Sequence, residues 1–583
     1  MICTMAERLY RWTKKKLRHQ LAVVRGEQAP SLVLKNATYL NQARQKWLKA
    51  NIWISKDTIV YVGKEMPPTL HDAEVIDCSN RFIVPGYIEH HAHPFQLYNP
   101  QSFSKYASLT GTTTFINDNL LFLMALEKKK ALSLINKLDE TPISMYWWCR
   151  YDTQTELNNH ETISNSKMKE WLEHHLVLQG GELTSWPKVL NGDDAILHWI
   201  QETKRLGKPI EGHFPGASEK TLTQMALVGV TADHEAMTGE EALKRIDLGY
   251  YTSLRHSSIR PDLGKMITEL KELGLDTFDR CLMTTDGSPP SFYEPGVMNH
   301  LIKIAIEHGI PPIDAYHMAS FNVAKYYHLE SKQGMIAPGR LANLNFLDSI
   351  ENPNPISVLS KGQWIVREGQ SYPEDESFPW SDYGVEPLNI QWELKEDELH
   401  FSMPMGIEMV NSVILKPYHI SIDATVTELS DEHDECFFAL IDRHGKWQIT
   451  TMIKRFAHKI SGLASSYSNT GDIILIGKNI SDMVCAFNQM KLQGGGITLA
   501  EGGEIIGNIE LPLLGMMSDK PMEVIMEQEK KLVALLRDRG YKHDDPIYSL
   551  LFFSSTHLPY IRVTQKGIYD VKKKTVLFPS IMR

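Results

Sequence analysis

The sequence of 583 residues predicts an α/β protein built around a (β/α)8 barrel, with a small composite β-sandwich domain and a C-terminal α/β domain. Two observations predict the barrel. Apolar stretches of strand length alternate with helical patterns between about residues 85 and 334, as in consecutive βα units. Several of these stretches end on a histidine or a carboxylate. Active sites of this fold lie at the carboxyl ends of the strands, where such side chains would converge.

A His-x-His pair ends the first of these stretches. Residues 83–93 read Ile-Val-Pro-Gly-Tyr-Ile-Glu-His-His-Ala-His and place His91 and His93 two positions apart. Alternate residues of a strand face the same side, so both imidazoles can reach one metal ion. The pair alone is weak support, because a chain with 23 histidines contains such pairs by chance.

Four later stretches of strand type also end on residues that bind metals, namely Glu182, His213, His234 and Asp286. Helical patterns between them cover residues 195–206, 218–227, 239–248 and 264–273. Taken singly, His213 or His234 is more typical of a packed, hydrogen-bonded core histidine. As an ordered set at successive strand ends, the residues predict a metal site.

Together these residues resemble the binuclear metal set of the amidohydrolase superfamily, and the sequence is similar to its adenine deaminase family. The similar segments are Gly-His-Phe-Pro-Gly at 212–216, Asp-His-Glu at 233–235, Gly-Gly-Gly at 494–496 and Leu-Pro-Leu-Leu-Gly-Met-Met-Ser at 511–518. The resemblance covers the chain from about residue 30. It implies that Glu182 bridges two divalent ions, with Mn or Fe favoured and Zn also compatible with such ligands.

The resemblance further implies a hydrolase that acts on carbon–nitrogen bonds of a cyclic amidine and converts adenine and water into hypoxanthine and ammonia. Divalent ions of this kind lower the pKa of a water molecule. The expected catalytic residues are Asp286, which would bind metal, accept the water's proton and return it to the leaving group, and the bridging Glu182. Asp118 and Glu235 are the expected substrate contacts.

The sequence departs from the family pattern where substrate should bind. Residues 94–97 read Pro-Phe-Gln-Leu where the family has Ile-Glu-Ser-Ser, and Asp118 is followed by Asn-Leu-Leu instead of Pro-His-Glu. Gly287 replaces an acid, and residues 466–471 replace an Ala-His-Asp-Ser-His segment by Ser-Tyr-Ser-Asn-Thr-Gly. We therefore expect a more apolar pocket, in which adenine is a poorer substrate than a related or more apolar heterocycle.

Two other interpretations stay open at this point. One is an amidohydrolase that acts on a different heterocycle or a cyclic amide. The other is a descendant that binds a metal or ligand without turnover, against which the complete ligand set argues. Trp147, Trp148 and Tyr151 are equally compatible with the wall of a ring-binding pocket and with core packing.

Composition excludes several classes of protein. The six cysteines are scattered and form no Cys-x-x-Cys, which argues against a disulfide framework, a structural zinc site and the cysteine-ligated zinc deaminases. A net charge of −10 disfavours nucleic-acid binding, and the basic cluster at residues 8–18 is more typical of a solvated helix face. No apolar run reaches the roughly 18 residues of a membrane span. We expect a cytoplasmic enzyme with a small heterocyclic substrate, no nucleic-acid or membrane partner, and compatibility with a homo-oligomer.

The expected organisation has four parts. An N-terminal helical extension covers residues 1–30, and a composite β domain combines residues 31–84 with 335–371. The barrel with its metal site covers residues 85–334, and an adenine-deaminase-like domain covers 380–583 after a linker rich in proline and acidic residues.

Overall fold

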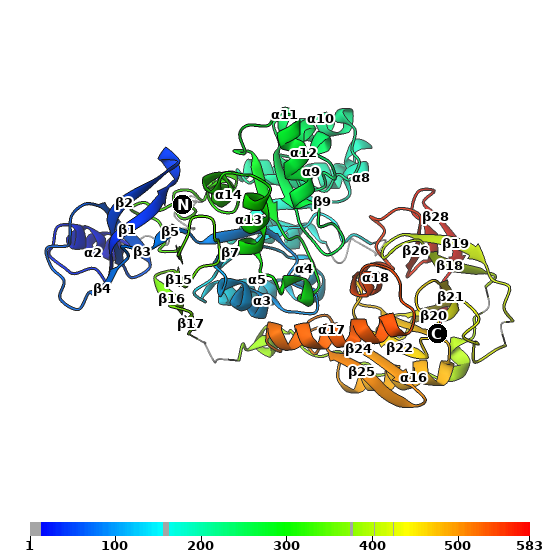
Figure 1. Ribbon diagram of the computed structural model, residues 1–583. Helices are drawn as coiled ribbons and strands as arrows, with labels where there is room; N and C mark the ends of the chain where they lie inside the picture. Colours follow the sequence, from blue (N-terminus) through cyan, green and yellow to red (C-terminus); the bar gives the residue numbers. More distant parts are fainter. Residues whose placement is uncertain (1–12, 156–162, 373–376, 402, 424) are drawn as a thin grey trace.

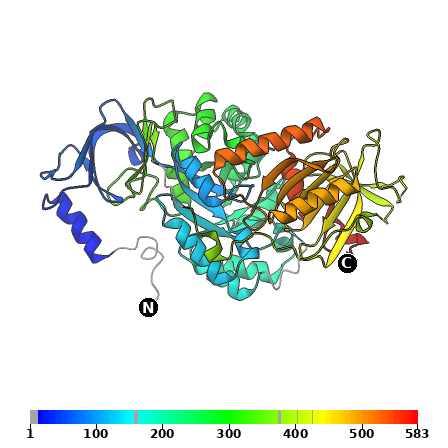
Figure 2. The same ribbon diagram turned by 90° about the horizontal axis from the view of Figure 1, so that it is seen from below.

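The computed structural model describes residues 13–155, 163–372, 377–401, 403–423 and 425–583. The barrel lies in the middle of the molecule, with the N-terminal β-rich part on one side and the C-terminal part on the other (Figure 1). The view from below shows the same order (Figure 2). The beginning of the basic cluster, up to residue 12, lies outside the described residues.

Eight parallel strands form the barrel sheet, in the order β6 to β13. They are β6 Tyr87–Ala92, β7 Thr112–Asp118, β8 Ser144–Cys149, β9 Val177–Leu183, β10 Ile210–Gly212, β11 Ala232–Asp233, β12 Tyr251–Arg255 and β13 Cys281–Thr284. Every residue of β6, β7, β8 and β9 is buried, as expected for parallel strands that are covered on both faces. The predicted barrel is therefore confirmed.

Helices connect and surround these strands (Figure 1). They are α3 Pro100–Ser108, α4 Leu120–Ala125, α5 Lys128–Asp139, α7 Asn165–Glu173, α8 Trp186–Leu190, α9 Asp194–Arg205, α10 Glu219–Val228, α11 Gly239–Asp247, α12 Leu263–Glu272, α13 Met298–Glu307, α14 Pro312–Met318 and α15 Phe321–Tyr326. The sequence sets their ends. In α10, the Ser218 side chain accepts a hydrogen bond from the Thr221 N–H, and Gly229 ends the helix at φ 104°, in the left-handed region.

A buried carboxylate joins the first and last strands of the barrel. Glu89 of β6 accepts hydrogen bonds from the Thr284 hydroxyl at 2.7 Å and from the Thr285 N–H at 2.9 Å, both at the end of β13. It also accepts one from the His91 N–H at 3.0 Å. Burial raises the pKa of Glu89. The carboxyl ends of β6 and β13, which carry predicted metal ligands, are thereby fixed next to each other.

The N-terminal β sheet combines chain segments from before and after the barrel. Its strands are β1 Leu32–Asn41, β2 Lys46–Ser55, β3 Thr58–Gly63, β4 Glu74–Asp77, β5 Phe82–Pro85, β14 Leu344–Leu347, β15 Ser357–Ser360, β16 Gln363–Arg367 and β17 Gln370–Ser371. The two segments meet where β5 pairs antiparallel with β14, with Val84 opposite Asn345. Helix α2, Lys14–Val24, packs Val23 against this sheet.

The described residues of the C-terminal part form a larger sheet, a three-stranded sheet and three α-helices, besides two short 3-10 helices at Trp380–Tyr383 and Glu396–Leu399. The larger sheet contains β18 Met405–Met409, β19 Leu415–His419, β20 Glu435–Ile441, β21 Trp447–Lys454, β22 Gly462–Ser465, β23 Ile473–Gly477, β24 Gly496–Glu501, β25 Glu504–Glu510 and β29 Ile581–Met582. The smaller one contains β26 Ile561–Thr564, β27 Gly567–Asp570 and β28 Thr575–Pro579. The helices are α16 Ile480–Leu492, α17 Met522–Asp538 and α18 Pro546–Phe552. No helix of the described residues is long and apolar enough to span a membrane.

This C-terminal part covers the carboxyl ends of the barrel strands. After β6, the Asn99 amide donates to the Ser518 carbonyl at 2.8 Å. After β12, the Ser258 hydroxyl donates to the Asp545 carboxylate at 2.9 Å, and after β13 the Ser291 N–H donates to Glu529 at 2.9 Å. Part of the wall of the cavity at this end of the barrel therefore comes from a segment that lies far away in the sequence.

The buried Glu529, which accepts from the Ser291 N–H, predicts a pH dependence of the folding stability. Burial raises the pKa of Glu529 from 4.5 to about 7, so folding favours its protonated form. The protonated Glu529 side chain therefore contributes its full share of the folding stability below pH 4.5, and this contribution is lost as the pH rises to about 7. Glu529→Gln should remove this dependence and stabilise the protein above pH 7 by roughly 1–3 kcal/mol. Thermal unfolding of both proteins at several pH values measures it. Glu527→Gln, an exposed site on the same helix, is the control, and a parallel pH profile for wild type and Glu529→Gln would contradict the prediction.

Candidate metal centre and active-site cavity

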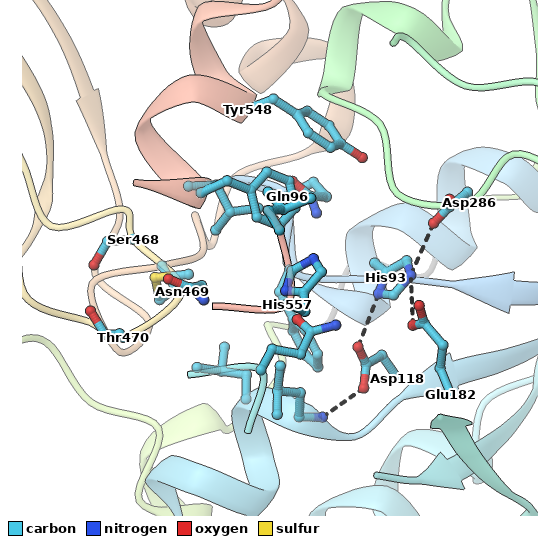
Figure 3. A pocket seen from close by; sticks show the side chains of 18 of the residues that line it. His93, Gln96, Asp118, Glu182, Asp286, Ser468, Asn469, Thr470, Tyr548 and His557 are labelled. Atoms are coloured by element: carbon cyan, nitrogen blue, oxygen red, sulfur yellow. Dashed lines mark hydrogen bonds and ion pairs between the residues drawn. The ribbon is translucent and has the colours of Figure 1, made fainter. Parts of the chain in front are cut away.

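The structure brings the predicted metal ligands together at the carboxyl face of the barrel. His91 lies in β6 and His93 follows it, Glu182 lies in β9, His213 and His234 directly follow β10 and β11, and Asp286 follows β13. Figure 3 shows His93, Glu182 and Asp286 side by side at one wall of the cavity. His93 Nε2 lies 2.9 Å from Asp286 Oδ1.

The carboxylate of Glu182 lies between two pairs of histidines. Its Oε2 is 3.8 Å from Nε2 of His91 and 3.8 Å from Nε2 of His93. Its Oε1 is 2.6 Å from His213 Nδ1 and 3.6 Å from His234 Nε2. Each carboxylate oxygen thus faces one pair of imidazole nitrogens, which is the arrangement that a bridging carboxylate requires.

These donors fit a divalent metal. The potential ligand atoms of His91, His93 and Glu182, and those of Glu182, His213 and His234, lie within 4.8 Å of one another. Among the described residues, His91 Nε2 is buried and has no hydrogen-bond partner. A buried polar atom without a partner is costly, and a metal ion would satisfy it. Imidazole nitrogens with carboxylate oxygens suit Zn, Fe or Mn.

A buried glutamate orients two of the histidines. Glu211 in β10 accepts from His91 Nδ1 at 3.0 Å and from His234 Nδ1 at 3.3 Å, which leaves the Nε2 atom of each ring for the centre. The Gln179 amide also donates to Glu211, at 3.0 Å. Glu211 is not among the residues predicted from the sequence, although its place inside an apolar strand, two residues before His213, is a usable signal.

Arg150, at the end of β8, connects Asp118 to Glu182. It donates to Asp118 Oδ2 at 2.6 Å, and the same nitrogen lies 2.7 Å from Glu182 Oε2 without the alignment of a hydrogen bond. Burial raises the pKa of Asp118, but Arg150 and His93 outweigh it and hold the pKa at about 2. Asp118 also accepts from His93 Nδ1 at 2.9 Å. Its carboxylate is thus ionised and positions His93, and whether it also contacts substrate stays a prediction.

Arg255, at the end of β12, connects Asp286 to Glu235. Its Nη1 lies 2.7 Å from Glu235 Oε1 and 2.8 Å from Asp286 Oδ2. Arg260 binds the other oxygen of Glu235 at 2.7 Å. Burial raises the pKa of Asp286, but Arg255 and His93 hold it well below its usual range. Asp286 has a φ of 53°, in the left-handed region that aspartate tolerates and that is common at functional sites.

Comparisons with known proteins agree with this geometry. Residues 82–365 match the "Amidohydrolase family", and residues 415–575 match the "Adenine deaminase C-terminal domain". The chain is 70% identical to "Putative adenine deaminase BH0637" of Halalkalibacterium halodurans, over 99% of this chain and 100% of that protein. It is 52% identical to "Putative adenine deaminase YerA" of Bacillus subtilis, over 99% of this chain and 100% of that protein. The chain belongs to the adenine deaminase family. It is also 28% identical to "Adenine deaminase" of Bacillus velezensis, over 96% of this chain and 98% of that protein.

A cavity of about 440 Å³ adjoins the candidate metal centre. Its volume lies in the usual range of about 300–1,000 Å³ for small-molecule sites. Phe95, Leu120 and Leu121, which depart from the family pattern, line it, as do Asp118 and Glu235. The C-terminal part adds polar and apolar side chains to the lining. These include Arg443, Asn469, Met516, Tyr548, Leu551 and His557.

Three departures from the family pattern lie close together beside this cavity, and one of them, Gln96, lines it. The Tyr467 hydroxyl donates to the Gln96 side chain, and so connects the C-terminal part to the loop after β6. A Cβ atom added at Gly287 would lie 3.0 Å from Gln96 Nε2 and 3.0 Å from His93 Cβ, so an acid at this position would be crowded. These changes therefore form one packed group and are not independent losses of polar contacts.

Other residues lie where the sequence could not place them. Trp148 stacks on the ring of His91, with 4.6 Å between centroids, and both Trp147 and Trp148 are fully buried outside the cavity lining. His557 lies with its ring 5.8 Å from that of His213, and burial lowers its pKa to about 3. Nothing in the sequence around His557 indicates that this side chain lies next to a predicted metal ligand.

Proposed function

We propose that this protein is a hydrolytic deaminase that uses two divalent ions, Mn or Fe in preference to Zn, to convert adenine and water into hypoxanthine and ammonia. The observation that carries the proposal is Glu182, because each of its carboxylate oxygens faces a different pair of histidines at the wall of a cavity. The names of the relatives supply adenine as the substrate.

In this proposal, the residues divide the chemistry between them. Bound divalent ions would lower the pKa of a water molecule and so supply the nucleophile near neutral pH. The Asp286 carboxylate, kept ionised by Arg255, accepts a proton from this water and delivers it to the leaving amino nitrogen. Glu235 is held by Arg255 and Arg260 at the cavity wall, where it can accept a hydrogen bond from the substrate.

Release of ammonia from a panel of heterocycles tests the proposal. Purified protein loaded with Mn²⁺ is expected to release ammonia from adenine, and kcat/KM values are compared with those for substituted aminopurines and aminopyrimidines. Cyclic amides are tested in parallel for ring opening. Because Phe95, Leu120 and Leu121 line the cavity, a more apolar aminopurine is expected to have a higher kcat/KM than adenine. Adenine itself is expected to be turned over poorly, and a kcat/KM for adenine of about 10⁵ M⁻¹s⁻¹ or above would contradict this expectation. Failure to release ammonia from any aminopurine would contradict the proposed reaction.

A further inference from the structure

A turn of the C-terminal part projects toward the cavity from the side opposite to the metal ligands. It covers residues 468–471, and the Gly471 N–H donates to the Ser468 carbonyl at 3.0 Å to close it. Gly471 has a φ of 74°, which glycine adopts without strain. The Asn469 N–H donates to the Leu551 carbonyl at 3.0 Å, and Arg443 Nε donates to the Gly471 carbonyl at 2.9 Å. The turn is therefore fixed from both sides.

Asn469 lies within this turn and has a side chain without a partner. Both polar atoms of its carboxamide are buried, and neither makes a hydrogen bond to any of the described residues. Asn469 belongs to the cavity lining, and Figure 3 shows it across the cavity from His93, Glu182 and Asp286. Buried amides are almost always hydrogen-bonded, so this one is expected to find its partner in a ligand.

The chemistry of the carboxamide limits what that partner can be. It offers an N–H donor beside a carbonyl acceptor in one plane, which matches a flat group that presents an acceptor beside a donor. When C6 of a free purine faces the metal ligands, its opposite edge carries N3, an acceptor, and N9–H, a donor. A substituent on N9, as in a nucleoside, removes the donor. The apolar side chains of Met516 and Leu551 also line the cavity and offer no polar group that could replace the ligand in these bonds.

We propose that Asn469 determines substrate specificity by pairing with the N3 and N9–H edge of a free purine, and thereby selects the free base over purines substituted on N9. Asn469 Nδ2 donates to N3, and Oδ1 accepts from N9–H. The orientation of the purine rests on the proposed function, which places C6 at Asp286 and the metal ligands. The pairing itself does not require turnover and can be measured by binding alone.

Binding of the product and its analogues tests the pairing. Calorimetry with the full-length, Mn²⁺-loaded protein measures hypoxanthine, 9-methylhypoxanthine and 3-deazahypoxanthine, which lacks the N3 acceptor. Wild type should bind hypoxanthine about 10–100-fold more tightly than either analogue, because each analogue leaves one buried polar atom of Asn469 unpaired. In Asn469→Leu both ratios should fall to about threefold or less, since no pairing remains to be lost.

Asn469→Asp separates the two bonds and keeps the size of the side chain. A carboxylate can still accept from N9–H but cannot donate to N3, so discrimination against the 9-methyl analogue should persist while discrimination against the 3-deaza analogue disappears. Ser468→Ala controls for disturbance of the turn, because the Ser468 hydroxyl donates to the Asp472 carbonyl at 2.7 Å, and this variant should keep both ratios.

The results of these binding and activity measurements show whether the Asn469 pairing or the proposed deamination is wrong. Equal discrimination by wild type and Asn469→Leu, or absence of hypoxanthine binding to wild type, would overturn the role of Asn469. Dependence on both edge atoms without ammonia release from adenine would support the pairing and contradict only the proposed reaction.

Discussion

Asp286→Asn is expected to lower kcat for deamination by about 10²–10⁴-fold, the usual cost of losing a general acid–base group. The amide is neutral and cannot take a proton from water, and it cannot balance the charge of Arg255, which lies 2.8 Å from Asp286 Oδ2. The β13 strand and its contacts to Glu89 do not involve this side chain, so the fold should persist. Steady-state ammonia release measures the loss of kcat, and a thermal unfolding curve shows whether the fold persists.

Metal content has to be measured on the same samples, because Asp286 is also an expected ligand. Loss of activity at full metal content would assign the effect to proton transfer, and loss of both would assign it to metal binding. Asp276→Asn, at an exposed position before β13, is the matched control for removal of one carboxylate. Turnover at the wild-type rate by Asp286→Asn would remove Asp286 from the mechanism.

The barrel was predictable because its signals are local. Burial on both faces makes each strand apolar, and function places a ligand at its end, so His91, Glu182 and Asp286 each mark a strand in the sequence. Predicted helices at 195–206 and 218–227 correspond to α9 and α10. Strands β8 and β12 are not marked in this way, because Arg150 directly follows β8 and Arg255 ends β12, and arginine is not a metal-binding residue.

The other half of the cavity was not predictable for a physical reason. His557 reaches it only through the packing of the C-terminal part on the barrel, and that packing leaves no period or spacing in the sequence. Asn469 lies in the segment 466–471, which only the resemblance to the family, and no local pattern, places near the substrate. The predicted apolar residues do line the cavity, and polar groups from this distant part line it as well. Gln96, Gly287 and Tyr467 look like separate losses in the sequence, but in the structure Gln96 binds Tyr467 and lies where a side chain at position 287 would have to fit.

Glu182→Ala is expected to reduce the metal content from up to two divalent ions per chain to at most one, and to abolish measurable deamination. Oε2 of this carboxylate faces His91 and His93, and Oε1 faces His213 and His234, whereas Glu211 contacts only one histidine of each pair, through the Nδ1 atoms that point away from the centre. Without it, each pair keeps its imidazoles but loses the shared anionic ligand. Elemental analysis after dialysis against metal-free buffer measures the number of ions retained.

Glu182→Ala also leaves Arg150 without the carboxylate it faces, so the fold as well as the metal content can change. A second variant separates these two effects. Glu182→Gln retains the shape and one oxygen ligand, so its fold should be closer to that of wild type while its metal content still falls, because the neutral amide binds divalent ions weakly. Glu219→Ala, at an exposed site in the first turn of α10, should retain both ions. Two ions per chain in Glu182→Ala would show that the histidine pairs bind metal independently, and the bridging role of Glu182 would then be wrong.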